Sequence, residues 1–141
     1  MVAEMSSVYS SSTYQPALCV DGVTANPSPS DLNICLSALN RPNTYLSATL
    51  AAPSVVSEVV IYGRSDCCND RFLGAFEVYL TTTGGDMLCG SGTASQPAAS
   101  VNTISCGGRT GRVVTLLLLG SARTMMISEL VVRGYANHLD I

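Results

Sequence analysis

The residues at positions 63–80 read GRSDCCNDRFLGAFEVYL. Two adjacent cysteines lie between two arginines, and an aspartate stands close to each arginine. Consecutive Cα atoms are only about 3.8 Å apart, whereas those of disulfide-bonded cysteines are usually about 5.5 Å apart. A Cys67–Cys68 disulfide therefore stores strain, and strain of this kind is normally retained where it serves a function. The stretch is a candidate binding site that leads into a β-strand.

Short apolar segments rich in β-branched residues surround this stretch. They read VVSEVVIYG (55–63), RFLGAFEVYL (71–80), VVTLLLL (113–119) and MMISELVVRGY (125–135). Turn or loop composition separates them at 26–33, 81–86, 90–100 and 106–111. This pattern is typical of an all-β sandwich. We expect a single domain over residues 1–141, with its core at about 5–135.

Alternation along each segment predicts which side chains share a face of the sheet. In the first segment, one face carries Val56, Glu58, Val60 and Tyr62, and the other carries Val55, Val59 and Ile61. In the second segment, the shared apolar face carries Phe72, Phe76, Val78 and Leu80. The segment 113–119 is apolar on both faces and should be a central strand. In the last segment, the side chains expected to point inward are Met126, Leu130 and Val132.

Composition and charge exclude several classes of function. Hydrophobic residues make up 47% of the 141 residues and charged residues only 12%, which indicates a globular chain. A net charge of −3 provides no basic field for nucleic acid. The longest apolar run, Val113–Leu119, is too short to insert directly into a membrane. The single histidine, His138, is a poor general base near the C-terminus, so we expect a protein that is not an enzyme.

Six cysteines give an even count, and they are Cys19, Cys35, Cys67, Cys68, Cys89 and Cys106. A zinc site would require CxxC pairs or histidine partners, which the sequence lacks, so a disulfide framework in an oxidising compartment is the better interpretation. Six cysteines allow fifteen pairings, and these spacings select none of them. The N-terminus, MVAEMSSVYSSS, is not a signal peptide. We therefore expect a domain excised from a larger secreted or cell-surface protein that contains further domains.

Two interpretations of the charged residues in 62–71 remain open. An arginine presents five donors in a planar fork, which suits vicinal hydroxyls, and a compact disulfide suits the apolar edge of a sugar. In this hypothesis Asp66 fixes the fork of Arg64. In the alternative, Arg64 and Arg71 simply pair with Asp66 and Asp70 on a solvated hairpin, each pair contributing less than about 1 kcal/mol.

The segment 63–80 resembles the Arg-x-Asp-Cys-Cys-x-x-Arg signature of the F-type (fucose-binding) lectins. Three further segments are similar to that family: ALCVDG (17–22), GRVVTLLL (111–118) and MMISELVV (125–132). The resemblance implies a discoidin-like jelly-roll β-sandwich. It also implies an extracellular or cell-surface lectin domain whose partner is a glycan, either fucose or a related sugar.

In this family a histidine and two arginines donate to the sugar. The resemblance assigns the arginines to Arg64 and Arg71, and it packs the apolar edge of the sugar on the Cys67–Cys68 disulfide. The position that corresponds to the histidine is Ser37, and Asn40 is the nearby residue that could replace it. Loss of a charged donor could cost a few kcal/mol. An alternative is therefore a degenerate F-type lectin fold that serves protein–protein adhesion or assembly without sugar binding.

The resemblance also implies a pairing of the cysteines. The cysteine that precedes the family's glutamate is Ser128 here, and Cys19 appears instead within the turn at 17–22. The implied disulfides are Cys19–Cys35, Cys67–Cys68 and Cys89–Cys106.

A structural calcium ion is implied as the cofactor. Asp21 and Glu129 correspond to its side-chain ligands, and carbonyl groups near four residues would complete the shell: Leu18, Val23, Ile34 and Ser128. The alternatives are that Asp21 caps an Asx-turn and that Glu129 pairs with an arginine.

Overall fold

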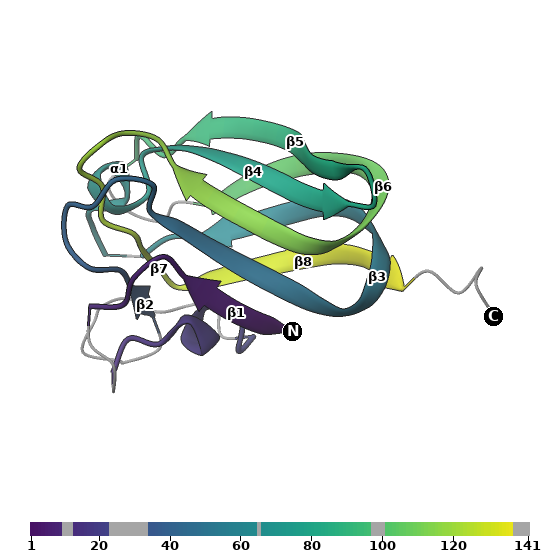
Figure 1. Cartoon of the computed structure of the whole chain (residues 1–141). Coiled ribbons are helices and arrows are strands. Elements are labelled where there is room, and N and C mark those ends of the chain that lie inside the picture. The colour runs from purple at the N-terminus through teal and green to yellow at the C-terminus, as the bar shows by residue number, and fades with distance from the viewer. Residues whose placement is uncertain (10–12, 23–33, 65, 97–100, 137–141) are drawn as a thin grey trace.

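The protein is described by a computed structural model, which is an antiparallel β-sandwich (Figure 1). The residues described are 1–9, 13–22, 34–64, 66–96 and 101–136. The strands are β1 (Val2–Met5), β2 (Cys35–Leu36), β3 (Tyr45–Tyr62), β4 (Ala75–Thr82), β5 (Gly85–Thr93), β6 (Val101–Leu118), β7 (Met126–Ile127) and β8 (Glu129–Ala136). The helices are the 3-10 helix η1 (Pro16–Cys19) and α1 (Asn69–Phe72). The all-β prediction is confirmed.

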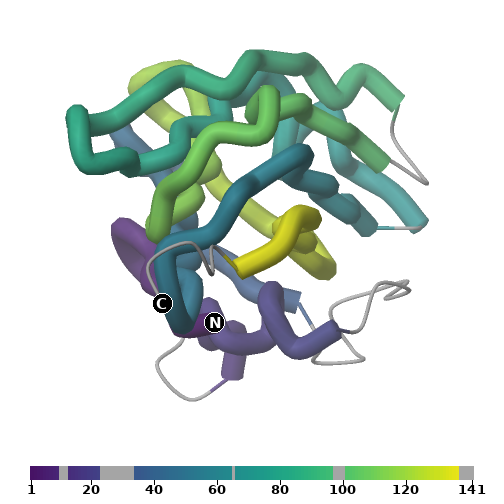
Figure 2. The backbone as a smooth tube through the Cα atoms, turned by 90° about the vertical axis from the view of Figure 1, so that its right-hand side faces the viewer, coloured from purple at the N-terminus to yellow at the C-terminus, as the bar shows by residue number. Residues whose placement is uncertain are grey.

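The two layers of the sandwich share their longest strands, β3 and β6. The first half of β3 pairs with the second half of β6 in a layer with the order β1-β3-β6-β4-β5. The register shifts between Thr49 and Ser54, and beyond this point the remaining halves of β3 and β6 pair with each other, with β8 on the other side of β3. Figures 1 and 2 show β4 and β5 on the opposite side of the molecule from β1 and η1. Neither described helix is long and apolar enough to cross a membrane.

The core lies between the layers and follows the alternation of the strands. The inward side chains of β4 and β6 are fully or almost fully buried: Phe76, Val78, Leu80, Val114, Leu116 and Leu118. Pairing on both sides confirms that β6 is the central strand expected at 113–119. Its outer face is only half-buried, at Val113 and Leu117, because no described element covers that face.

A β-bulge overturns the prediction for one face of β3. The register shifts between Val56 and Glu58. An extra residue in one strand moves the following side chains to the other face. Val56 therefore lies in the same core cluster as Val59 and Ile61, instead of on the opposite face.

Two further predicted faces are corrected. Phe72 lies in α1, before β4 begins at Ala75, so it does not share the strand face of Phe76. The last predicted segment is divided at Ser128 into β7 and β8. As a result Ile127 joins the main core cluster, while Met126 joins a separate cluster. Leu130 is buried as predicted.

The turn predictions have mixed outcomes. The segment 81–86 forms the β4–β5 hairpin, closed by the pair Thr82 and Gly85. The segment 106–111 is not a loop but part of β6, where Gly107 and Gly108 have φ of +67° and +71°. Glycine adopts this left-handed conformation without steric cost, which allows the strand to continue. Residues 90–93 likewise continue β5, whereas 97–100 and 26–33 lie outside the described residues.

Three disulfides link all six cysteines: Cys19–Cys35, Cys67–Cys68 and Cys89–Cys106. This is the pairing that the resemblance implies. The first joins η1 to β2 and the third joins β5 to β6. The vicinal pair joins neighbouring residues whose Cα atoms are 3.7 Å apart.

Thiol titration of the untreated protein, unfolded under non-reducing conditions, is expected to find no reactive thiol. All six cysteines are paired, so unfolding exposes disulfides and not thiols. A protein sample treated with a dithiol reductant serves as the positive control and should give six thiols. Two reactive thiols in the untreated protein would contradict the Cys67–Cys68 bridge.

Candidate functional site

The loop from β3 to β4 is organised by a buried side chain that the sequence analysis missed, Asn69. It is 0% exposed. Its Oδ1 accepts a hydrogen bond of 2.7 Å from the backbone N–H of Arg64, and its Nδ2 donates one of 2.6 Å to the Arg64 carbonyl. A Cβ atom at Gly63 would lie 2.1 Å from Asn69 Oδ1, so the close approach requires glycine. The only signal in the sequence is the position of Asn69 next to the cysteine pair.

Arg64 is largely committed to contacts within the protein. It is 8% exposed, and its Nε and Nη2 donate to the two carboxylate oxygens of Asp66 at 2.9 and 2.7 Å. Its Nη1 lies 3.2 Å from the sulfur of Met126. The hydrogen bond from Arg64 is the main reason why the pKa of Asp66 is lowered. These contacts use three of the five guanidinium N–H groups, which leaves two for a ligand.

The vicinal disulfide begins the turn that carries Arg71. Cys68 has φ of +74°, a left-handed conformation that is costly for a residue other than glycine. Its carbonyl accepts hydrogen bonds from the N–H groups of Arg71 at 3.0 Å and Phe72 at 2.8 Å. The strained disulfide and Arg71 are therefore held within a single helical turn.

Arg71 is exposed, and its guanidinium carbon lies 5.2 Å from the centre of the Phe72 ring. Within the described ranges it makes no ion pair, because the two salt bridges there join Arg64 to Asp66 and Arg133 to Glu58. Of the two pairs expected in the hairpin alternative, Arg64–Asp66 is confirmed, whereas Arg71–Asp70 is not among these bridges. Residues 69–72 form the helical turn α1 instead of a hairpin. The fork of Arg71 faces solvent with its donors available for a ligand.

Ser37 is buried, in contrast to Arg71. It is 0% exposed, its N–H donates to the carbonyl of Met125 at 2.9 Å, and its Oγ accepts from the N–H of Met125 at 2.8 Å. The same Oγ donates to the carbonyl of Ala38. Asn40 is exposed, with φ of +54°, and its backbone N–H donates to Thr124. The Ser37 hydroxyl is thus bonded internally, and Asn40 presents a side chain to solvent.

The segment that follows β2 at Ser37 and the segment between β3 and β4 that carries Arg64 meet at one end of the sandwich. Ser37 contacts Met125, and Arg64 contacts the next residue, Met126. The residues around Ser37 and around Arg64, about thirty positions apart in the sequence, therefore both contact the segment at the start of β7. Arg64, Cys67, Cys68 and Arg71 belong to the segment between β3 and β4, and Ser37 follows β2 and is buried.

Glu129 and Asp21 form a second set of polar groups. Glu129 is 2% exposed, and its Oε2 accepts a 2.7 Å hydrogen bond from the N–H of Gly22. Its Oε1 is buried without a hydrogen-bond partner within the described residues. Burial raises the pKa of Glu129 to about 7, the Gly22 N–H opposes this rise, and the nearby Asp21 carboxyl adds to it. Within the described residues, Glu129 makes no ion pair with an arginine.

The remaining residues expected around a calcium ion have varied placements. Ile34 and Ser128 are 0% exposed, and Leu18 is half-buried in η1. The Ser128 hydroxyl donates to the carbonyls of Tyr62 and Gly63, both at 3.0 Å. Val23 lies outside the described residues. No group of three or more His, Cys, Asp or Glu residues occurs in the part that is described, so a metal shell would depend on carbonyl oxygens.

Comparison with known proteins identifies the fold. No protein-family model and no curated protein sequence matches this chain. Among solved structures, the fucolectin from the serum of the striped bass, Morone saxatilis, superposes with a TM-score of 0.82 and 26% identity. The match covers 96% of this chain but only 47% of the bass chain. This chain has the fucolectin fold.

Two further modules have a similar fold. The lectin domain of lectinolysin, solved with Lewis B antigen, gives a TM-score of 0.77 and 17% identity over 96% of this chain and 93% of its own. A fucose-binding module of Streptococcus pneumoniae gives a TM-score of 0.77 and 18% identity, and the match covers 95% of this chain and 93% of the module. The resemblance to the F-type lectins, inferred from the Arg-x-Asp-Cys-Cys-x-x-Arg segment, is confirmed.

Proposed function

We propose that this chain is a carbohydrate-binding domain of a secreted or cell-surface protein, and that it binds fucose or a related sugar without catalysis. The observation that carries this proposal is the turn 67–71, where an exposed arginine stands next to a vicinal disulfide. The disulfide provides a compact, weakly polar surface for the apolar edge of a sugar. Arg71 provides the donors for its hydroxyls.

Arg64 and Asp66 have a supporting role in this proposal. The bidentate ion pair fixes the guanidinium plane of Arg64, which leaves two N–H groups to donate. Asn69 holds the backbone of Arg64, and the carbonyl of Cys68 holds the backbone of Arg71. The donors are therefore preorganised before the sugar arrives, which lowers the entropic cost of binding. The fucolectin and fucose-binding structures with the same fold support this assignment.

Calcium is the second part of the proposal. The buried Oε1 of Glu129, which lacks a partner among the described residues, fits a cation that prefers oxygen ligands. Burial is the main cause of the raised pKa of Glu129 and the Asp21 carboxyl adds to it, and a cation would offset both effects. In this position the ion would tie the turn at 21–22 to the start of β8.

The Arg71→Ala variant is expected to lose sugar binding while its unfolding temperature stays nearly unchanged. A shallow site for one monosaccharide should have a Kd of about 1 mM, so loss of a charged donor removes detectable binding. NMR titration with L-fucose measures the affinity. Arg133→Ala is the matched control and should bind as the wild type does. It removes an exposed arginine of β8 that is paired with Glu58 of β3. Unchanged binding by Arg71→Ala would refute the proposed site.

A second candidate function is favoured by the burial of Ser37. Its hydroxyl is bonded to Met125, and Arg64 has two N–H groups left, so the site contains fewer donors than the family pattern implies. The alternative is an adhesion or assembly module that binds protein and not sugar. A glycan array probed with clustered copies of the domain distinguishes the two, since clustering multiplies weak affinities. Complete absence of glycan binding would support the protein-binding alternative.

A further inference from the structure

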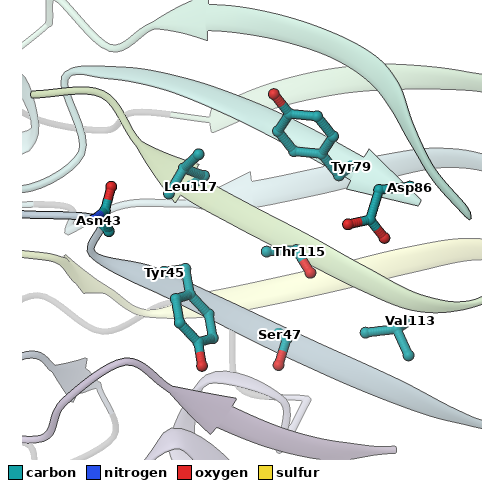
Figure 3. A pocket seen from close by; sticks show the side chains of 8 residues that line it. All are labelled: Asn43, Tyr45, Ser47, Tyr79, Asp86, Val113, Thr115 and Leu117. Carbon is teal, nitrogen blue, oxygen red and sulfur yellow. The ribbon is translucent and has the colours of Figure 1, made fainter. Parts of the chain in front are cut away.

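A groove of about 500 Å³ lies on the outer face of the layer that contains β1, β3, β6, β4 and β5, away from the turn 67–71. Its floor is the half-buried outer face of β6, formed by Val113, Thr115 and Leu117. Tyr45 of β3 and Tyr79 of β4 stand on opposite sides of this floor (Figure 3). The groove is therefore an apolar strip flanked by two aromatic rings.

The strand register fixes the positions of the two tyrosines on the sheet. Tyr45 pairs with Leu117, and Tyr79 pairs with Thr115, the next outward residue along β6. Neighbouring strands are about 4.8 Å apart, so the Cα atoms of two residues on either side of β6 are separated by about 10 Å across the sheet. This separation suits an extended ligand of more than one ring. A single monosaccharide would contact only one tyrosine.

The groove is bordered by acidic side chains. Asp86 lines it, and the register places Glu77 and Glu4 on the same face, because Glu77 is paired with Leu117 and Glu4 with Ser47. The Tyr79 hydroxyl donates to Glu77 at 2.8 Å, and Thr81 donates to Asp86 at 2.6 Å. Each bond occupies one carboxylate oxygen, which leaves the second oxygen of each group for another donor.

The charged side chains placed on this face by the pocket lining and the strand registers are carboxylates. The hydrogen bond to Glu77 is the main cause of the raised pKa of Tyr79, and the charges of Glu77 and Asp86 add to it. At the groove, the outward positions that the registers pair on the described strands β1, β3, β4, β5 and β6 contain no arginine. The chain contains no lysine. Arg112 lies at one end of the floor, but its guanidinium donates to the carbonyls of Leu50 and Ala51. The carboxylates therefore face a ligand without a competing cation.

We propose that this groove is a second binding site and that it takes a chain of amino sugars with protonated amino groups. The apolar faces of consecutive pyranose rings would stack on the strip between Tyr45 and Tyr79, and the ammonium groups would donate to Asp86 and Glu77. Acidic glycans are repelled by the same carboxylates. A neutral glycan leaves these carboxylates partly desolvated without a charged partner, which costs affinity. The site is independent of the proposed fucose site.

Isothermal titration with a fully deacetylated glucosamine tetrasaccharide, at a pH at which its amino groups are protonated, tests the proposal. The N-acetylated tetrasaccharide has the same rings without the charges, and it is expected to bind at least tenfold more weakly. Asp86→Asn should weaken binding of the deacetylated chain about tenfold, and added salt should weaken it further. Asp86 is exposed, so this variant should fold as the wild type does. Arg71→Ala should bind as the wild type does.

Three results would overturn the proposal. Equal affinity for the acetylated and deacetylated chains would show that the carboxylates do not contribute. Equal affinity for a tetralysine peptide would show that charge alone is recognised and that the aromatic rings are not used. Loss of binding in Arg71→Ala but not in Asp86→Asn would place the ligand at the turn 67–71. Because fucose binding is measured separately with Arg71→Ala, failure here leaves the proposed function intact.

Discussion

Calcium is expected to raise the unfolding temperature of this protein by about 5–10 °C at mildly alkaline pH, when the ion is present at a hundredfold excess over its Kd. A ligand that binds only the folded state at this excess stabilises it by about 2.7 kcal/mol. The physical reason is the buried carboxylate of Glu129, whose Oε1 has no partner in the described part of the chain. Thermal melts with calcium and with a chelator measure the difference. Identical melts would refute the calcium proposal.

The effect of pH on these melts follows from the raised pKa of Glu129. Its ordinary value is 4.5 and its value in the folded protein is about 7. Between these values the folded protein keeps a proton that the unfolded chain releases, so without calcium the free energy of unfolding falls as the pH rises. The loss across this window is at most about 3 kcal/mol. Calcium needs the ionised carboxylate, so its stabilising effect should grow as the pH rises through about 7.

The matched variant for this prediction is Glu129→Gln. Its amide oxygen can still accept the hydrogen bond from Gly22, but it has no charge for calcium or for repulsion with Asp21. In chelator at alkaline pH it should be at least as stable as the wild type, and calcium should not stabilise it. A variant that keeps the full response to calcium would show that the ion lies elsewhere.

Replacement of Asn69 by alanine is expected to destabilise the protein by about 2–4 kcal/mol and to abolish sugar binding. The variant loses both hydrogen bonds to the backbone of Arg64, and each buried polar group left without a partner costs about 1–3 kcal/mol. It also removes the side chain that holds Arg64 in place before the disulfide. Denaturant unfolding measures the stability, and NMR titration with L-fucose measures the binding.

Asp70→Ala is the control for Asn69→Ala, because Asp70 is the next residue in the same turn and is exposed. Its substitution should change the free energy of unfolding by less than about 0.5 kcal/mol. An Asn69→Ala protein as stable as Asp70→Ala would mean that the loop is held by other contacts, and that the geometry of Arg64 does not depend on Asn69.

Features that depend on neighbouring residues were predictable from the sequence. The alternation of Phe76, Val78 and Leu80 identified the inner face of β4, because side chains in a strand alternate regardless of what covers them. The place of the two cysteines between two arginines was also visible in the sequence, and the resemblance to the F-type lectins implied the Cys67–Cys68 disulfide that the structure contains. The spacing of the signature was sufficient to suggest the fucolectin fold.

The register and the burial of individual side chains were decided only by the tertiary structure. The bulge that places Val56 in the core is an irregularity of pairing with β6 and β8, and the sequence 55–63 alternates as though it were absent. The two arginines of the signature look equivalent in the sequence. Yet Arg64 is buried against Met126 while Arg71 faces solvent.

The sequence by itself determined the strand pattern and the signature with its adjacent cysteines and two arginines. The tertiary structure decided which arginine is exposed, that Asn69 holds the loop, and that Ser37 is bonded to Met125. Periodicity reports contacts between residues a few positions apart. The contact of Arg64 with Met126 and the bonds of Ser37 with Met125 instead join residues 62 and 88 positions apart, whereas Asn69 bonds Arg64 only 5 positions away. The two long-range contacts exist only once the sandwich has closed.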